Sequence, residues 1–299
     1  MRQDSVPFDD GLIDSWIVAL LAERKAVETI ETYRKGIRHY ARWCDAGARP
    51  RLLSHDGFQQ YLAELVEEGR LADNSIASRH ITVRQFSAWL ALEEDCEDPL
   101  LLVSGPKVDE KIVQPLTEQE LSALFAACRG FAFMDRRDEA LARFIGECGT
   151  RASETLTMTI TGTSISAGTT VITGKGSKER LVGFGPQTAR AIDRYLRARR
   201  SHRLATTDAL WLGDRGKGFT YAGLSKAMLR RADEAGIDGF YLHRLRHTFA
   251  DRWLDRGGSE GGLMAQAGWN SRKMVDRYTK ARAAARALEE SRRLGLGDL

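Results

Sequence analysis

The first hundred positions of the chain carry apolar residues at the spacing of amphipathic helices. Two such series fall within residues 10–44: Leu12, Trp16, Leu20 and Leu21 in the first, and Ile30, Tyr33, Ile37, Tyr40 and Ala41 in the second. Further helices are expected at about 54–68 and 73–95. Because no strand-like alternation of apolar and polar residues occurs before residue 100, we predict a bundle of four or five helices.

The helical pattern breaks at residues 98–115, where three prolines and a glycine interrupt it. We place a linker at residues 104–114 within this stretch. Thr117 and Glu120 have the spacing of a capping box, which predicts the first helix of a second domain. The chain is therefore expected to form one domain at residues 1–103 and another at residues 115–299.

The second domain combines helices with a short Thr-, Ile- and Val-rich stretch. A long helix is expected at 136–149 and a short one at 152–158. Residues 160–173 and 180–184 flank a Gly-Lys-Gly-Ser turn, which predicts a small antiparallel sheet with a hairpin. Further helices are expected at 186–200, 221–235, 243–256, 261–267, 271–279 and 281–293. The predicted fold class is mainly α with a small antiparallel β-sheet: a helical N-terminal domain followed by a mixed α+β domain.

The distribution of charge points to a polyanionic partner. Residues 109–299 carry 32 Lys and Arg against 23 Asp and Glu, whereas residues 1–108 carry 13 against 18. The acidic first domain argues mildly against such a partner there, unless its charges are segregated by face. Segregation is plausible, because three arginines share one face of the second helix, and a later helix adds two more: Arg34, Arg38 and Arg42, then Arg79 and Arg84.

Composition excludes several other classes of protein. The chain is 42% hydrophobic and 29% charged, as in folded globular proteins. No apolar run approaches the roughly 18 residues of a membrane span, and the N-terminus lacks the pattern of a signal peptide. The four cysteines are far apart and form no Cys-x-x-Cys pair: Cys44, Cys96, Cys128 and Cys148. We therefore expect a cytoplasmic protein with reduced cysteines, no metal site, no cofactor and no membrane partner.

Four segments of the basic domain contain residues suited to phosphate chemistry. They hold Arg151 between two expected helices, Lys175, Lys178 and Arg180 on the glycine-flanked turn, His243 and Arg246 on one helix face, and Tyr278 after Gly268-Trp269. Each segment by itself also fits an ordinary structural role: a surface arginine near a cap, a solvated hairpin, a capping histidine and a packed aromatic ring.

Taken together and in this order, the segments resemble the tyrosine recombinase family, the phage-integrase and Xer-type site-specific recombinases. Arg151, Lys175, the His243-x-x-Arg246 box, Gly268-Trp269 and Tyr278 follow one another over about 130 residues. The resemblance covers nearly the whole chain. Residues 10–98 are similar to the family's core-binding domain and residues 115–299 to its catalytic domain.

The resemblance implies a role for each residue. Arg151 and Arg246 would bind the scissile phosphate, and Tyr278 would be the nucleophile. Lys175 would protonate the departing 5′ oxygen, with Lys178 as the alternative. The hairpin residues Lys178 and Arg180 and the arginines of the first domain would contact DNA.

Three further residues complete the expected site. His243 would donate a hydrogen bond to the phosphate. Trp269 stands where many relatives have histidine, and its indole N–H can donate a hydrogen bond but cannot move a proton. Glu154 matches a position at which relatives often carry a supporting acidic residue.

The resemblance implies a DNA strand-exchange enzyme that needs neither metal nor ATP and acts as a tetramer on two duplex sites. A stripe of small apolar residues on the last helix suits docking on a neighbouring protomer: Ala281, Ala284, Ala285 and Leu288. Two alternatives remain, a type IB topoisomerase-like enzyme and a non-catalytic DNA-binding protein of the same fold. Since the chain starts almost directly with the helical region, we expect a simple recombinase without an additional arm-binding domain.

Overall fold

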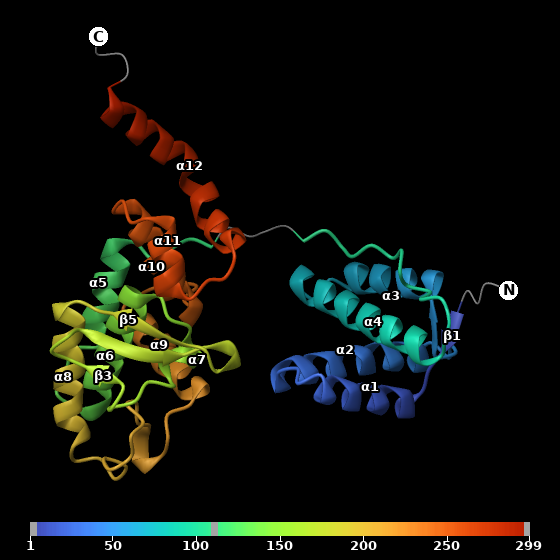
Figure 1. Cartoon of the computed structure of the whole chain (residues 1–299), viewed down its shortest axis with the longest axis horizontal. Helices are drawn as coiled ribbons and strands as arrows, with labels where there is room; N and C mark the ends of the chain where they lie inside the picture. Colours follow the sequence, from blue (N-terminus) through green and yellow to red (C-terminus); the bar gives the residue numbers. More distant parts are fainter. Residues whose placement is uncertain (1–4, 109–112, 296–299) are drawn as a thin grey trace. The chain divides into compact units, whose positions relative to one another are not determined.

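The chain folds into two compact units, Met1–Lys111 and Ile112–Leu299 (Figure 1). The computed structural model describes residues 5–108 and 113–295, with the side chains in these ranges except those of 175, 215, 277–286 and 289. Within the described residues, none of the helices is both long and apolar enough to cross a membrane.

Four helices build the first unit: α1 (Asp10–Ala22), α2 (Val27–Ala46), α3 (His55–Glu68) and α4 (Asp73–Glu93). Asp9 and Ser54 cap α1 and α3 by accepting the backbone N–H groups of Leu12 and Gly57. The inward faces bury a core of large side chains, including Trp16, Ile37, Phe58 and Phe86. The predicted helical bundle is confirmed, and residues 5–108 contain four of the four or five helices expected.

The first unit also contains two short strands, β1 (Ser5–Pro7) and β2 (Leu52–Ser54). They pair antiparallel with Val6 opposite Leu53, and both of these side chains are buried. The expectation that no strand precedes residue 100 was therefore wrong. Three residues are too few to display a period of two, and this pairing depends on packing between segments that lie far apart in the sequence.

The second unit surrounds its core with helices α5 (Glu118–Ala127), α6 (Phe133–Cys148), α8 (Pro186–Arg199), α9 (Tyr221–Glu234) and α10 (Leu242–Asp255). Thr117 and Glu120 form the predicted capping box of α5. The helix α6 packs on both α8 and α10, so its buried face forms the centre of the unit. Short 3₁₀ turns occur at Lys175–Ser177 (η1) and Asp214–Gly216 (η2).

One edge of the second unit carries an antiparallel sheet of three strands, β3 (Thr163–Ser164), β4 (Thr169–Thr173) and β5 (Glu179–Gly183). The strands β4 and β5 form the predicted hairpin, with Thr173 opposite Glu179. The turn η1 joins them. The small antiparallel sheet is confirmed, and the hairpin places Lys175 at its turn.

The helix predicted at 152–158 is shorter, because α7 spans only Ala152–Thr155. The chain beyond it bonds to a distant segment. The Met158 carbonyl accepts from the N–H of Leu210, and the N–H of Ile160 donates to the Asp208 carbonyl. These long-range bonds replace the local ones that would continue the helix.

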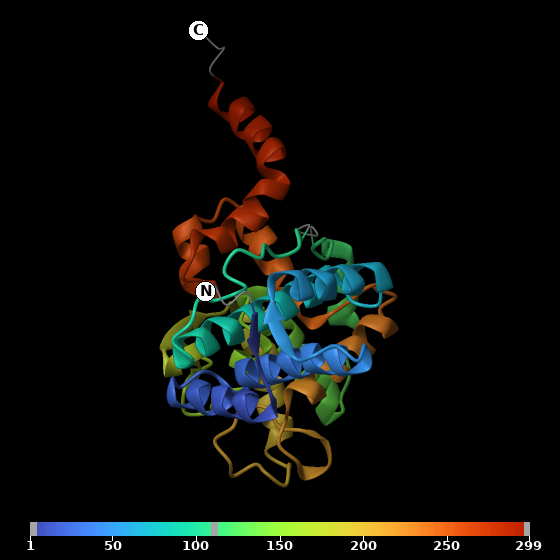
Figure 2. The ribbon, with the colours of Figure 1, turned by 90° about the vertical axis from the view of Figure 1, so that its right-hand side faces the viewer.

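The chain ends in α11 (Glu260–Ala267) and α12 (Arg272–Leu294), and α12 extends beyond α10 and α11 in both views (Figure 1 and Figure 2). Gly268 ends α11, and Ser271 caps α12 by accepting the N–H of Lys273. Two helices had been predicted at 271–279 and 281–293, but a single helix forms. Neither glycine nor proline occurs between residues 272 and 294, so nothing interrupts the backbone bonds.

Candidate active site

Three of the residues singled out from the sequence line one small hollow in the second unit. Arg151 precedes α7, and His243 and Arg246 lie on the first turns of α10. The hollow has a volume of about 140 Å³, and Tyr221, at the start of α9, also lines it. Two guanidinium groups and an imidazole around one hollow form a site for an anion.

Arg246 is held rigidly, since only 1% of its surface is exposed. Its guanidinium donates to the carbonyl oxygen of Gly149 and, at 2.8 Å, to that of Ala267. Gly149 caps the C-terminus of α6 and Ala267 is the last residue of α11. The cation therefore lies at the negative ends of two helix dipoles, which stabilise its charge in a buried position.

Arg151 is more open, with 44% of its side chain exposed. Its Nη1 donates to Glu154 Oε1 at 2.6 Å, and the same atom lies 3.5 Å from the carbonyl oxygen of Gly268. One edge of the guanidinium is thus anchored to the protein, while its exposed surface is accessible to a ligand in the hollow.

Glu154, the partner of the Arg151 guanidinium, is buried. Besides Arg151, it accepts a hydrogen bond at 2.7 Å from Nη2 of Arg180 on β5. Burial raises the pKa of this carboxyl, but hydrogen bonds from Arg180 and Arg151 outweigh that effect and hold the pKa below its ordinary value. Glu154 is therefore ionised and positions two arginines at once.

His243 lies beside both site arginines. Its partial burial and the positive charges of Arg246 and Arg151 lower its pKa below the ordinary value of 6.5. The imidazole also packs edge-to-face against His247, with 4.9 Å between ring centroids. A neutral imidazole keeps one N–H to donate near neutral pH.

Trp269 follows directly after Gly268 and is buried in a separate apolar cluster with Phe249, Leu263 and Val275. Its ring lies 5.3 Å from the guanidinium carbon of Arg246, within range of a cation–π contact. Trp269 thus joins the start of α12 to the buried arginine.

Two predicted site residues lie outside the described side chains. Lys175 belongs to η1 and Tyr278 to α12, and the structure gives only their place in these elements. Lys178, the alternative hairpin lysine, is exposed.

The five arginines proposed to contact DNA from the first unit lie on two helices that pack together, α2 and α4. On α2, Arg42 is exposed, Arg38 pairs with Asp14 at 3.3 Å, and Arg34 pairs with Glu31. On α4, Arg79 is half-buried, and Arg84 donates to the carbonyl oxygen of Val103 at 3.3 Å.

The structure gives Arg180 surroundings that differ from those of an exposed DNA contact. Only 18% of its side chain is exposed, and it faces Glu154 and the carbonyl oxygen of Gln266. Strand alternation could have indicated this orientation, because Arg180 and the buried Val182 are two residues apart on one strand face. Tyr221 also lines the hollow without having been predicted, and no local sequence signal marks it.

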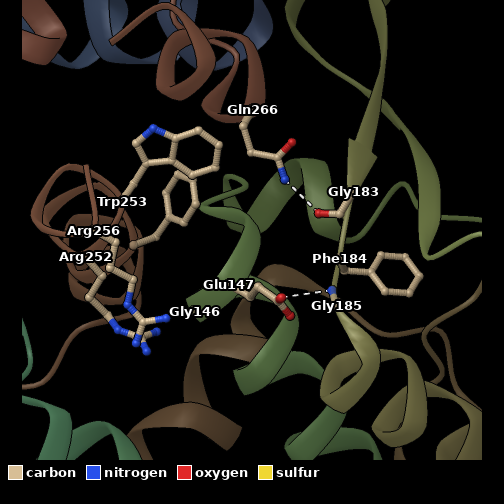
Figure 3. Close-up of a pocket in the computed structure, with 10 residues that line it drawn as sticks. Gly146, Glu147, Gly183, Phe184, Gly185, Arg252, Trp253, Arg256 and Gln266 are labelled. Atoms are coloured by element: carbon tan, nitrogen blue, oxygen red, sulfur yellow. Dashed lines mark hydrogen bonds between the residues drawn. The ribbon is translucent and has the colours of Figure 1, made fainter. Parts of the chain in front are cut away.

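A larger hollow of about 280 Å³ lies between β5, α6, α10 and α11 (Figure 3). Its lining includes Glu147, Arg252, Trp253, Arg256 and Gln266. None of the predicted site residues with described side chains lines it. Among the described side chains, no group of three or more His, Cys, Asp or Glu is arranged to hold a metal ion.

The chain is similar to known proteins over both units. Residues 114–285 match the phage integrase family, and residues 13–94 match the phage integrase N-terminal SAM-like domain. The tyrosine recombinase XerD of Yersinia pestis is 31% identical over 256 residues, which cover 83% of this chain and 85% of that protein. XerD of Xanthomonas campestris pv. campestris is 30% identical over 285 residues, covering 91% and 88%.

Solved structures of recombinases share the fold. XerH bound to difH in a post-cleavage complex has a TM-score of 0.73 at 20% identity, with 90% of this chain and 82% of that chain covered. A lambda integrase tetramer bound to a Holliday junction has a TM-score of 0.72 at 14% identity, covering 93% and 78%. With the family match over more than half of the sequence, the chain belongs to the phage integrase family and is a site-specific tyrosine recombinase.

Proposed function

We propose that this recombinase cuts and rejoins double-stranded DNA through a 3′-phosphotyrosyl intermediate formed by Tyr278. The observation that carries the proposal is the hollow around which Arg151, His243 and Arg246 converge from two elements. Its size and positive charge suit a phosphodiester group. Tyr278 lies on α12, which begins three residues after Trp269.

In the proposed reaction Tyr278 attacks the scissile phosphorus. A free tyrosine has a pKa near 10, so its phenol must release its proton to solvent water as the new oxygen–phosphorus bond forms. Negative charge then grows on the non-bridging oxygens, where Arg151 and Arg246 provide forked N–H donors. The bond to the 5′ oxygen breaks, and Lys175 on the hairpin provides the proton that this oxygen needs.

His243 and Trp269 add hydrogen-bond donors to the same phosphate in this proposal. Removing one preorganised donor of this kind commonly costs about 10²–10³ in rate. The rigid anchoring of Arg246 supports a role in preorganisation, because two backbone carbonyls fix its guanidinium and the residue lines the hollow.

We further propose that the reaction needs neither metal nor ATP. The two arginines supply the positive charge at the phosphate. The phosphotyrosyl bond retains the energy of the broken phosphodiester bond, so a second DNA end can reverse the step. The protein would act in the cytoplasm on chromosomal DNA.

The two domains would have separate roles on DNA. Residues 1–103 would be a DNA-binding domain, joined by residues 104–114 to a catalytic domain at 115–299. The arginines on α2 and α4 and the hairpin Lys178 would contact the duplex. Four protomers would join two sites, each docking its C-terminal helix on a neighbour. The exposure of Leu288 and Leu294 on α12 supports such docking.

The test is a denaturing gel that detects protein covalently joined to DNA. Nicked duplexes carrying a site selected from a randomised pool by the wild-type protein would trap the intermediate. We expect the Tyr278→Phe variant to bind this DNA and form no adduct. Tyr33→Phe is the matched control, since it removes the same hydroxyl in the first unit, and it should leave adduct formation intact.

An undiminished adduct from Tyr278→Phe would overturn the assignment of the nucleophile. A wild-type protein that binds without any adduct would indicate a non-catalytic DNA-binding protein. A two-site recombination assay separates strand exchange from relaxation of supercoils by a monomer, as a type IB topoisomerase-like enzyme would perform.

A further inference from the structure

We infer that Arg180 is a positioning residue of the recombination reaction, and that it holds together the three segments carrying Arg151, Lys175 and Tyr278. The inference rests on the proposed function. It assigns Arg180 a role inside the protein framework instead of a contact with DNA.

The first link joins Arg180 to Arg151 through Glu154. Nη2 of Arg180 donates to Glu154 Oε2 at 2.7 Å, while Nη1 of Arg151 donates to Oε1 at 2.6 Å. Each guanidinium thus occupies one oxygen of a buried carboxylate. Without Arg180, the buried Glu154 carboxylate would keep only one of its two arginine partners. The position in which it holds the Arg151 guanidinium would then shift.

The second link joins Arg180 to the turn that precedes α12. Its Nε lies 3.4 Å from the carbonyl oxygen of Gln266, and the Gln266 side chain donates back to the carbonyl oxygen of Gly183 on β5 at 2.8 Å (Figure 3). Gly268 has a φ of +65°, and a Cβ there would lie 2.7 Å from the guanidinium carbon of Arg180. Only glycine lets the turn approach Arg180 this closely.

The third link joins Arg180 to the base of the hairpin turn. Arg180 pairs with Ile172 in the β4–β5 ladder, two residues before Gly174. A Cβ on Gly174 would lie 3.7 Å from both Arg180 Nη1 and Glu154 Oε1, so the chain passes directly over the ion pair. Lys175 is the next residue.

One guanidinium therefore bonds to Glu154, which holds Arg151, and to the end of α11 before Trp269 and α12, and it lies close to Gly174, the residue before Lys175. A displacement of about 1 Å at a reacting centre can reduce a rate by about 10²-fold, so such a support affects catalysis without touching DNA. Arg180 is not among the residues that line the hollow, and its Nε and Nη2 bond to acceptors of the protein, whereas Lys178 on the same hairpin is exposed.

The test compares Arg180→Met with Lys178→Met, since each removes one cation from the same hairpin. Binding to the selected duplex is measured over a range of salt concentrations, and the rate of adduct formation is measured on the nicked duplex at saturating protein. Thermal unfolding verifies that each variant is folded.

For Arg180→Met we expect an adduct rate lower by about 10²-fold, with a dissociation constant and salt dependence close to those of wild type. For Lys178→Met we expect weaker binding and a salt slope shallower by about one unit. Arg180→Lys should recover part of the rate, because an ammonium can pair with Glu154 without also reaching Gln266.

A second measurement combines Arg180→Met with Glu154→Gln. If Arg180 acts through Glu154, the double variant should be no slower than the slower single variant, whereas independent roles would multiply the two losses. Multiplied losses would overturn the inference. The inference would also be overturned if Arg180→Met or Arg180→Lys bound DNA more weakly and with a smaller salt dependence, while adduct formation at saturating protein kept the wild-type rate. A wild-type protein that forms no adduct would instead overturn the proposed function.

Discussion

The carboxylate of Glu154 holds Arg151 by two hydrogen bonds, one from its backbone N–H at 3.0 Å and one from its guanidinium at 2.6 Å. The first bond satisfies a free N–H at the start of α7, and the second fixes the direction of the side chain. Backbone and guanidinium are therefore positioned by one acidic residue three places along the chain. This makes Glu154 the residue on which the geometry of Arg151 depends.

The contribution of Glu154 to stability should depend on pH. Burial raises the pKa of its carboxyl, but hydrogen bonds from Arg180 and Arg151 bring the pKa below the ordinary 4.5. The unfolded chain then binds the proton at a higher pH than the folded protein does. The stabilisation is complete above about pH 4.5 and decreases as the pH falls through the folded pKa. Melting temperatures of wild type and Glu154→Gln should therefore converge at acidic pH. A constant difference would contradict the ionised pair.

His243 should be neutral at pH 7 in the free protein. Its partial burial and the charges of Arg246 and Arg151 place its pKa below 6.5, and a bound phosphate should raise that pKa by offsetting the two guanidinium charges. Nuclear magnetic resonance of ¹³C-labelled imidazole, with and without duplex, would measure both values. The variant His243→Gln assigns the resonance. A pKa at or above 6.5 without DNA would contradict the expectation.

Substitutions of Trp269 should separate packing from hydrogen bonding. Trp269→Phe keeps an apolar ring against Phe249 and Leu263 but removes the N–H, so we expect a modest loss of stability and a rate lower by up to about 10². Trp269→His keeps a donor and leaves a cavity, so it should be the less stable variant and the faster one per folded molecule. Adduct rates on a nicked duplex and melting temperatures measure the two effects. If the Phe variant is faster, the donor role is wrong.

Truncation after Lys280 should impair assembly more than single-site binding. The shortened chain lacks Leu288 and Leu294, which are exposed on α12, and retains Trp269 and the hollow. Sedimentation of the DNA complexes would measure the assembly. Truncation after Leu294 is the control, because it keeps all of α12. Tetramers formed equally well by both truncated chains would contradict a docking role for this helix.

Arg199 should be important for the stability of the second unit. This buried guanidinium donates to the carbonyl oxygens of Ala205, Thr207, Ala209 and Leu210 at 2.7–3.1 Å. Arg199→Met leaves these carbonyls without their donor, so we expect a loss of at least about 3 kcal/mol in the free energy of unfolding. Arg197→Met is the control, because Arg197 is exposed and pairs only with Asp193 among the contacts described. Urea unfolding measures both, and equal losses would contradict the prediction.

The local pattern of the sequence was sufficient for most of the helices and for the hairpin. Helical periodicity and caps such as Thr117 arise from contacts within about four residues, so they can be read along the chain. The order of Arg151, the His243-x-x-Arg246 box and Tyr278 indicated the family, which the comparisons confirmed.

Only the tertiary structure decided which groups meet. The pairing of β1 with β2, the addition of Tyr221 to the hollow and the inward position of Arg180 depend on segments that are distant in sequence. A charged side chain has the same local pattern whether it faces solvent or a buried carboxylate. Its role is set by the partner that folding brings to it, and for Arg180 that partner is Glu154, 26 residues away.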